Sequence, residues 1–166
     1  MDTVYFVEGQ CEKALFEESK RTGKIVPGRV VLFNTIQNRL ASRISTYKKG
    51  STFVLVFDTD KEKVDVLLAN ISDLKRISGS KIICLPQVLD FEDEIKRSCL
   101  GIKEIKEVTK SKSNKNFKPD FCACKNITAR LESSGFSLDK MWRKEIPDSF
   151  KVINEYINSN KIYGKY

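Results

Sequence analysis

The chain of 166 residues is 40% hydrophobic and 31% charged, which is typical of a soluble globular protein with one well-buried core and too short for two. No apolar run reaches the roughly 18 residues that cross a bilayer, and residues 1–7 show no signal-peptide pattern, so we expect a cytoplasmic protein without a membrane partner. The chain contains no histidine, which excludes Ser-His and Cys-His nucleophile pairs and leaves carboxylates, lysine, tyrosine or metal-bound water for any catalysis.

The net charge of +8 favours a polyanionic partner. Residues 1–100 carry a surplus of only +2, whereas residues 101–166 carry +6. Taken alone, this charge fits a solvated lysine-rich surface as well as it fits a binding face. A basic tail together with an acidic metal site is, however, what an enzyme acting on a phosphate backbone needs.

The cysteines indicate reduced thiols, because their number is odd and no secretory signal precedes them. No pair has the CxxC spacing, so a structural zinc site would have to recruit scattered residues. The five cysteines are Cys11, Cys84, Cys99, Cys122 and Cys124.

Short apolar runs alternate with helical patterns along the first hundred residues. Such alternation predicts an α/β fold with a four-stranded, mainly parallel sheet flanked by helices. The strands expected are 4–7, 29–33, 52–57 and 81–85, the last ended by Pro86. The helices expected are 10–21, 36–47, 62–77 and one that begins at Asp90 and continues through Ile102.

Carboxylates follow the first and third of these strands. Glu8 ends the first strand, and Asp58 and Asp60 end the third. In open α/β sheets the carboxyl ends of the strands form the ligand-binding edge, so these three side chains should share it. Three uncompensated carboxylates repel one another unless a cation holds them, and oxygen ligands suit Mg²⁺ or Mn²⁺.

The acidic run 90–94 has two explanations. Carboxylates in a first helical turn complement the helix dipole, which accounts for most such runs. We expect the strand order 2-1-3-4, in which the fourth strand lies beside the third and brings Glu92 or Asp93 within reach of the metal site.

Residues 103–166 differ in composition from the first part. We expect a core in residues 1–102 and a basic loop with a helical extension in 103–166, packed on that core. Residues 103–118 predict a surface loop, either solvated or in contact with phosphates, and helices are expected over 121–131, 138–143 and 150–157. We expect Phe136, Trp142 and Phe150 to pack the extension rather than to stack on bases. The candidate nucleic-acid-binding residues are Lys61, Lys112, Lys115 and Lys118.

The segment Val7-Glu8-Gly9-Gln-Cys-Glu12, paired with Val56-Phe57-Asp58-Thr-Asp60, resembles the Toprim domain over roughly residues 3–100. The resemblance implies that Glu8 is a metal ligand or general base, that Asp58 and Asp60 bind Mg²⁺, and that Glu12 could hold a second metal. Phe91-Glu92 is similar to a pair in RloB-like phage-defence proteins, which adds Glu92 to the candidate ligands, although the histidine-bearing segment that follows there is absent.

Topoisomerases and primases of this family need further domains, so the resemblance implies a small stand-alone nuclease or the catalytic subunit of a larger assembly. We therefore expect a divalent-metal-dependent nuclease that hydrolyses phosphodiester bonds in DNA or RNA, in phage defence, with a larger defence complex or ATPase subunit as partner. One alternative is a non-catalytic nucleic-acid-binding module whose carboxylates hold a structural cation. Another is a receiver-type phosphotransfer protein with Asp58 as phosphoacceptor, which requires a lysine after a fifth strand.

Overall fold

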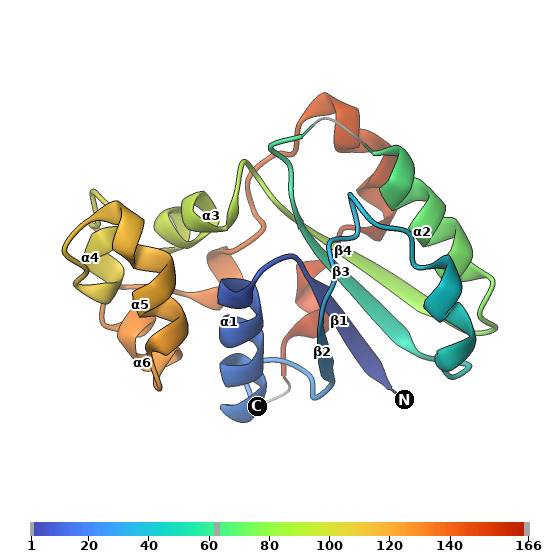
Figure 1. Ribbon diagram of the computed structural model, residues 1–166, viewed down its shortest axis with the longest axis horizontal. Helices are drawn as coiled ribbons and strands as arrows, with labels where there is room; N and C mark the ends of the chain where they lie inside the picture. The colour runs from blue at the N-terminus through green and yellow to red at the C-terminus, as the bar shows by residue number, and fades with distance from the viewer. Residues whose placement is uncertain (1, 62–63, 165–166) are drawn as a thin grey trace.

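A sheet of four parallel strands forms the centre of the computed structural model, which describes residues 2–61 and 64–164 (Figure 1). The order is β2-β1-β3-β4, so the predicted order 2-1-3-4 and the α/β class are confirmed. Every neighbouring pair runs parallel, and Phe6 of β1 pairs with Val31 on one side and Leu55 on the other. The strands are β1 (Thr3–Val7), β2 (Arg29–Leu32), β3 (Thr52–Asp58) and β4 (Lys81–Gln87).

Helices cover both faces of the sheet, which explains why the strands are continuous apolar runs. Tyr5 and Val54 face a core shared with α1 (Gln10–Arg21) and α3 (Phe91–Ser98), whereas Phe6 and Phe53 face a core shared with α2 (Asp65–Lys75). In Figure 1, α1 and α3 lie on the left of the sheet and α2 lies on the right. None of the helices in the described residues is long and apolar enough to cross a membrane.

The C-terminal part wraps around the core and packs on both faces. Trp142 contacts the ring of Phe16 at 6.0 Å between centroids, and Phe150 stacks on Phe57 at 5.9 Å. With Phe136 also buried, the expectation that these three aromatic residues pack the extension is confirmed. The helical segments here are α4 (Lys106–Thr109), η2 (Asn114–Asn116), α5 (Phe117–Ala123), α6 (Ile127–Glu132), η3 (Leu138–Lys140), η4 (Asp148–Tyr156) and η5 (Ser159–Ile162).

Two expectations about this part are wrong. Residues 103–118 are not an unstructured loop, because Val108 and Phe117 are fully buried and draw α4, η2 and the start of α5 onto the core. The single helix expected over 121–131 is two helices, since Cys124 adopts an extended backbone that ends α5 before α6 begins.

The helix expected over 36–47 is also wrong, since only the 3₁₀ segment η1 (Ala41–Thr46) forms there. The spacing that suggested a helix arises because Ile36 and Leu40 are buried by a loop. Asn70, fully buried on α2, holds this loop: its side chain accepts the Leu40 N–H at 2.8 Å and donates to the carbonyl oxygens of Thr35 and Asn38 at 2.9 and 2.8 Å.

Replacing Asn70 should therefore cost stability without any change in the sheet. We expect Asn70→Ala to lower the free energy of unfolding by about 2–4 kcal/mol, because three backbone groups, two of them buried, lose their partner. Urea denaturation measures this. The exposed Asn154, changed to Ala, serves as the control and should alter stability by less than about 0.5 kcal/mol. Equal stabilities of the two variants would contradict this account of the loop.

Smaller differences concern element ends. Pro86 does not end the fourth strand but pairs with Phe57, because β4 is the last strand of the sheet and a proline is tolerated at an edge. The helix that begins after Asp90 stops at Ser98 rather than Ile102, since the chain turns to pair with residues 134–137. The third predicted helix begins at Asp65, and its expected residues 62 and 63 lie outside the described residues.

Candidate metal centre

The first and third strands bring two of the predicted acids together at the carboxyl edge of the sheet. The backbone N–H of Asp58 donates to Oε2 of Glu8 at 3.2 Å. The other oxygen of Glu8, Oε1, accepts a hydrogen bond from the side-chain amide of Asn34. Glu8 is thus held on both oxygens from neighbouring strand ends, which fixes its carboxylate beside that of Asp58.

Asn34 follows β2, the strand on the other side of β1. Its carbonyl oxygen Oδ1 accepts the backbone N–H groups of Ile36 and Gln37 at 3.1 and 2.9 Å, so only its amide can point to Glu8. Sequence reasoning missed this residue. The available signal was its place directly after a predicted strand on the same edge as Glu8.

Asp58 is the predicted strand-end acid with an unsatisfied oxygen. Its Oδ1 is buried and has no hydrogen-bond partner. Burial raises the pKa of Asp58 from 3.8 to about 8, and the nearby negative charges add to this rise. In decreasing order of effect, these charges belong to Glu8, Glu12, Asp90 and Asp60. Every charge found to act on this carboxylate among the described residues is therefore negative.

Glu12 reaches the same place from the first turn of α1. Only 4% of the residue is exposed, and burial raises its pKa to about 7, with Glu8 and Glu92 contributing and Lys118 opposing. Gly9 makes room for it, because a Cβ at position 9 would lie 2.8 Å from Oε2 of Glu12. Glycine at this position therefore allows the inward orientation of Glu12.

Gln87 is a further polar residue at this edge that sequence reasoning did not identify. It is the register partner of Asp58 at the end of β4 and is fully buried. Neither Oε1 nor Nε2 of its side chain has a hydrogen-bond partner. A buried amide without partners is rare in folded proteins and is often explained by a functional role or a missing water or ion. The signal in the sequence was weak, since we expected the strand to end before it.

The segment after β4 supplies the remaining acids. Glu92 places one carboxylate oxygen in a buried position without a partner, while the other pairs with Lys118 at 2.9 Å. Asp90 caps α3 by accepting the Asp93 N–H at 2.9 Å and also raises the pKa of Asp58. Asp90 is thus an additional acid of the site and also the N-cap of α3. Glu92, Asp93 and Glu94 lie in the first turn, where the helix dipole favours acids. Asp60 is exposed at the outer margin.

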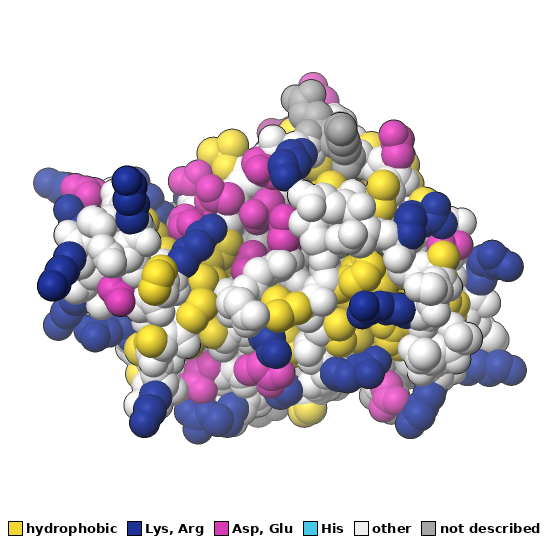
Figure 2. Space-filling view, viewed as in Figure 1, with side chains coloured by type: hydrophobic (Ala, Val, Ile, Leu, Met, Phe, Trp, Pro, Cys, Tyr) yellow, Lys and Arg dark blue, Asp and Glu magenta, His cyan; other side chains and the backbone are white. Residues whose placement is uncertain are grey.

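These acids form one continuous group, which we call the acidic edge: Glu8, Glu12, Asp58, Asp60, Asp90 and Glu92. Figure 2 shows acidic side chains gathered near the carboxyl ends of the strands, while Lys and Arg side chains lie mostly toward the outside. Across residues 2–61 and 64–164, no three Asp, Glu, Cys or His side chains are close enough to form a ready-made metal cage. A cation would have to draw the carboxylates together by side-chain rotation.

The donor set nevertheless fits a hard cation. Asp58 and Glu92 each offer a buried oxygen without a partner, and Gln87 offers an amide oxygen beside them. Carboxylate and amide oxygens without histidine or thiolate are the ligands typical of Mg²⁺ or Mn²⁺.

An open groove begins at Glu8 and leads away from the acidic edge. It has a volume of about 600 Å³ and lies between the first turn of α1, the end of β2 and the loop that Asn70 holds. Arg39 and Arg43 provide its positive charges: Arg39 pairs with Asp73 at 2.7 Å, and Arg43 lies over the ring of Phe33 at 5.0 Å. We call this surface the arginine groove, lined by Glu8, Gly9, Gln10, Leu32, Phe33, Asn34, Asn38, Arg39, Ser42 and Arg43.

The four lysines predicted to bind nucleic acid are distributed unevenly. Lys118 lies at the acidic edge, where it pairs with Glu92. Lys61 is exposed just after Asp60, and Lys112 and Lys115 are exposed on the segment between α4 and α5.

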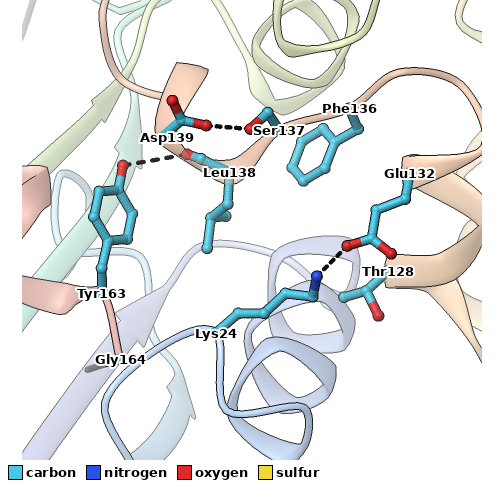
Figure 3. A pocket seen from close by; sticks show the side chains of 9 residues that line it. All are labelled: Lys24, Thr128, Glu132, Phe136, Ser137, Leu138, Asp139, Tyr163 and Gly164. Carbon is cyan, nitrogen blue, oxygen red and sulfur yellow. Dashed lines mark hydrogen bonds and ion pairs between the residues drawn. The ribbon is translucent and has the colours of Figure 1, made fainter. Parts of the chain in front are cut away.

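Another cavity, of about 380 Å³, lies away from the acidic edge, between α6 and the C-terminal segment (Figure 3). Its polar groups already have partners: Lys24 pairs with Glu132, Ser137 with Asp139, and the Tyr163 hydroxyl donates to the Leu138 carbonyl at 3.2 Å. This cavity therefore lacks the unpaired oxygens that distinguish the acidic edge.

Comparisons with protein-family models, with curated proteins and with solved structures found no match to this chain.

Proposed function

We propose that the protein is a divalent-metal-dependent nuclease that hydrolyses phosphodiester bonds in DNA or RNA. The single observation that carries this proposal is Asp58, a strand-end carboxylate with a buried, unpartnered oxygen among five other acids. Such a group is costly to keep charged unless a cation is bound. The Toprim resemblance of the same residues supports the reaction class.

Glu8, Asp58 and Asp60 would hold the first metal, and Glu12 and Glu92 a second. A bound Mg²⁺ or Mn²⁺ polarises the scissile phosphate and favours deprotonation of an attacking water. Residues of the chain orient the carboxylates that would bind the metal. Asn34 keeps the Glu8 carboxylate oriented through Oε1, and the Asp58 N–H does the same through Oε2.

Because the chain has no histidine, the carboxylates of the acidic edge are the groups placed to accept the proton of the attacking water. Where only the first metal is bound, Glu12 is suited to accept the proton, since its side chain is buried beside Glu8 and Asp58 and is kept inward by the space at Gly9. Lys118 provides the one ammonium group found paired with the described acids of the edge, and it can neutralise charge that develops on the phosphate.

The arginine groove gives this site a path for a polynucleotide backbone. It starts at Glu8 and presents two guanidinium groups together with the amides of Asn38 and Gln10, which are donors suited to phosphate oxygens. The exposed Leu32 adds apolar surface to the groove, and the Arg43 guanidinium over the Phe33 ring offers a planar surface on which a base can rest. The net charge of +8 favours the same partner.

Removing one charge from this groove should weaken nucleic-acid binding. We expect Arg43→Gln to lower affinity about 3- to 10-fold at low salt and to reduce the slope of log affinity against log salt by about 1, because one phosphate contact is lost. Fluorescence anisotropy with a labelled oligonucleotide at several salt concentrations measures both. Lys125→Gln, which removes one exposed charge outside the groove, is the control, and an equal loss in both variants would count against the groove.

The experiment that tests the function is incubation of the purified protein with plasmid, single-stranded DNA and transfer RNA in Mg²⁺, Mn²⁺ or EDTA. Cleavage that requires the metal and disappears in Asp58→Asn supports a nuclease. Salt-sensitive binding without cleavage in either metal would support the non-catalytic module instead. A receiver-type protein is disfavoured, because the described residues form a sheet of only four strands and so place no lysine after a fifth.

From the resemblance we also propose a role in phage defence, with a larger defence complex or an ATPase subunit as partner. Pull-down from cells expressing the tagged protein together with its neighbouring genes tests this. Recovery of the chain alone would count against a stable complex.

A further inference from the structure

Two cysteines from distant parts of the chain meet beside the acidic edge. Cys11, the second residue of α1, and Cys122, in α5, are separated by 111 positions in sequence, yet their sulfur atoms are only 3.2 Å apart. Figure 1 shows α5 lying beside α1, and the two helices are in contact. The sulfur of Cys11 also lies 3.6 Å from the carbonyl oxygen of Lys118, so the contact extends along the first turn of α5.

The two thiols differ in access. Cys11 is buried, whereas Cys122 is exposed. A small oxidant from solvent therefore reaches Cys122 first and finds Cys11 directly behind it. Both are free thiols in the structure, and a sulfur separation of 3.2 Å is short enough for side-chain rotation to close a bond between them.

The other cysteines do not share this arrangement. Cys84 is buried in the core on the α2 side of the sheet, and Cys99 is buried at the end of α3. Cys124 lies just beyond α5 and is only partly buried, but no contact joins it to another sulfur among the described residues. Oxidation should therefore select a single pair.

We propose that Cys11 and Cys122 form a disulfide when the protein meets hydrogen peroxide, and that this bond fastens α5 to α1 at the acidic edge. The Cys122 thiolate attacks one peroxide oxygen, the O–O bond breaks, and hydroxide leaves, which gives a sulfenic acid. The Cys11 sulfur then attacks the Cys122 sulfur, the S–O bond breaks, and water leaves. In total two thiols and one peroxide give one disulfide and two waters.

The bond acts on the site through Lys118. This residue is four positions before Cys122 on α5, and its ammonium pairs with Glu92 at 2.9 Å. In the reduced protein only side-chain packing, chiefly of the buried Phe117 and Phe121, holds α5 beside α1. The disulfide adds a covalent tether, so Lys118 should separate from Glu92 less readily in the oxidised protein. Oxidation should therefore oppose cation binding at Glu92 and Glu12, a consequence that rests on the proposed function.

Thiol counting and peptide mapping test the disulfide directly. The reduced full-length protein is treated with a small excess of hydrogen peroxide and then analysed under denaturing conditions. We expect the loss of two of the five thiols, a mass decrease of about 2 Da, and one linked peptide pair containing Cys11 and Cys122. The melting temperature should rise by about 5 °C or more and return on reduction, because the bond closes a long loop.

Matched serine variants distinguish a specific Cys11–Cys122 disulfide from nonspecific oxidation of other cysteines. Cys122→Ser should lose the linked peptide and the rise in melting temperature, whereas Cys124→Ser should keep both. Bridges that involve other cysteines, or a Cys122→Ser protein that still gains stability with peroxide, would overturn the proposal.

Mg²⁺ titration, followed by melting temperature, tests the consequence for the site. Oxidised wild type should need about threefold more Mg²⁺ than reduced wild type to reach half of the rise in melting temperature. In Lys118→Met the oxidised and reduced forms should need the same Mg²⁺ concentration. Equal midpoints in wild type would overturn the link to the site. If the bond forms but Mg²⁺ has no effect even on the reduced protein, the proposed metal site fails while the disulfide stands.

Discussion

Asp58→Asn should abolish metal-dependent cleavage and at the same time stabilise the metal-free protein. We expect the cleavage rate in Mg²⁺ to fall at least about 10³-fold, because the variant replaces a strand-end carboxylate with a buried, unpartnered oxygen by a neutral amide. In EDTA at pH 8 the free energy of unfolding should rise by roughly 1–3 kcal/mol, since the repulsion among Asp58, Glu8 and Glu12 is removed. Plasmid cleavage and urea denaturation measure the two effects.

The combination of lost activity and gained stability distinguishes a functional ligand from a structural one. Asp148→Asn is the control, because the Asp148 side chain is 92% exposed and pairs with Lys151 on the surface. It should change neither rate nor stability. An Asp58→Asn protein that cleaves at the wild-type rate would refute the nuclease proposal. A less stable variant would instead show that Asp58 contributes to the fold, contrary to its unpaired oxygen.

The fold could be predicted from the sequence because it depends on local patterns, each of which lies within a single strand or helix. Each strand is an apolar run that must be covered on both faces, and parallel connections have a preferred hand, so few arrangements remain. The same rules place Glu8 and Asp58 together at the carboxyl edge, and the structure joins them through a 3.2 Å hydrogen bond.

The parts that were missed depend on contacts between distant segments. The loop at Ile36 and Leu40 resembles a helix in its spacing, and only the side chain of Asn70, about 30 positions later, shows why it is not one. Asn34 and Gln87 have no sequence pattern of their own. Their roles become visible only when β2 and β4 lie next to the strands that carry Glu8 and Asp58.

In the basic segment 103–118, too, the sequence does not show which residue contacts a distant part of the chain. From composition, Lys112, Lys115 and Lys118 were equal candidates for nucleic-acid binding. Phe117 is fully buried against the ring of Phe121, which sets the first turn of α5 and directs Lys118 to Glu92. Burial of one aromatic residue therefore selects which lysine reaches the acidic edge.

Stability in EDTA should fall as pH rises from 5 to 8. The pKa of Asp58 is raised from 3.8 to about 8 and that of Glu12 from 4.5 to about 7, in both cases mainly by burial. Between the unfolded and the folded pKa values the folded protein binds more protons than the unfolded chain, so raising the pH favours unfolding. We expect a loss of about 2–4 kcal/mol in the free energy of unfolding, less than the full shifts imply because charged groups relax toward water.

This pH range is informative for this chain, because the chain contains no histidine, the side chain whose ordinary pKa lies within the range. Urea denaturation at pH 5, 6, 7 and 8 measures the slope, which Asp58→Asn should reduce by about half. Saturating Mg²⁺ should flatten or reverse the slope, since metal ligands must be deprotonated to bind. If the slope is the same with and without Mg²⁺, the cation does not bind to these carboxylates. If stability in EDTA instead rises with pH, Asp58 and Glu12 are paired in solution by a positive charge, and the acidic edge needs no metal.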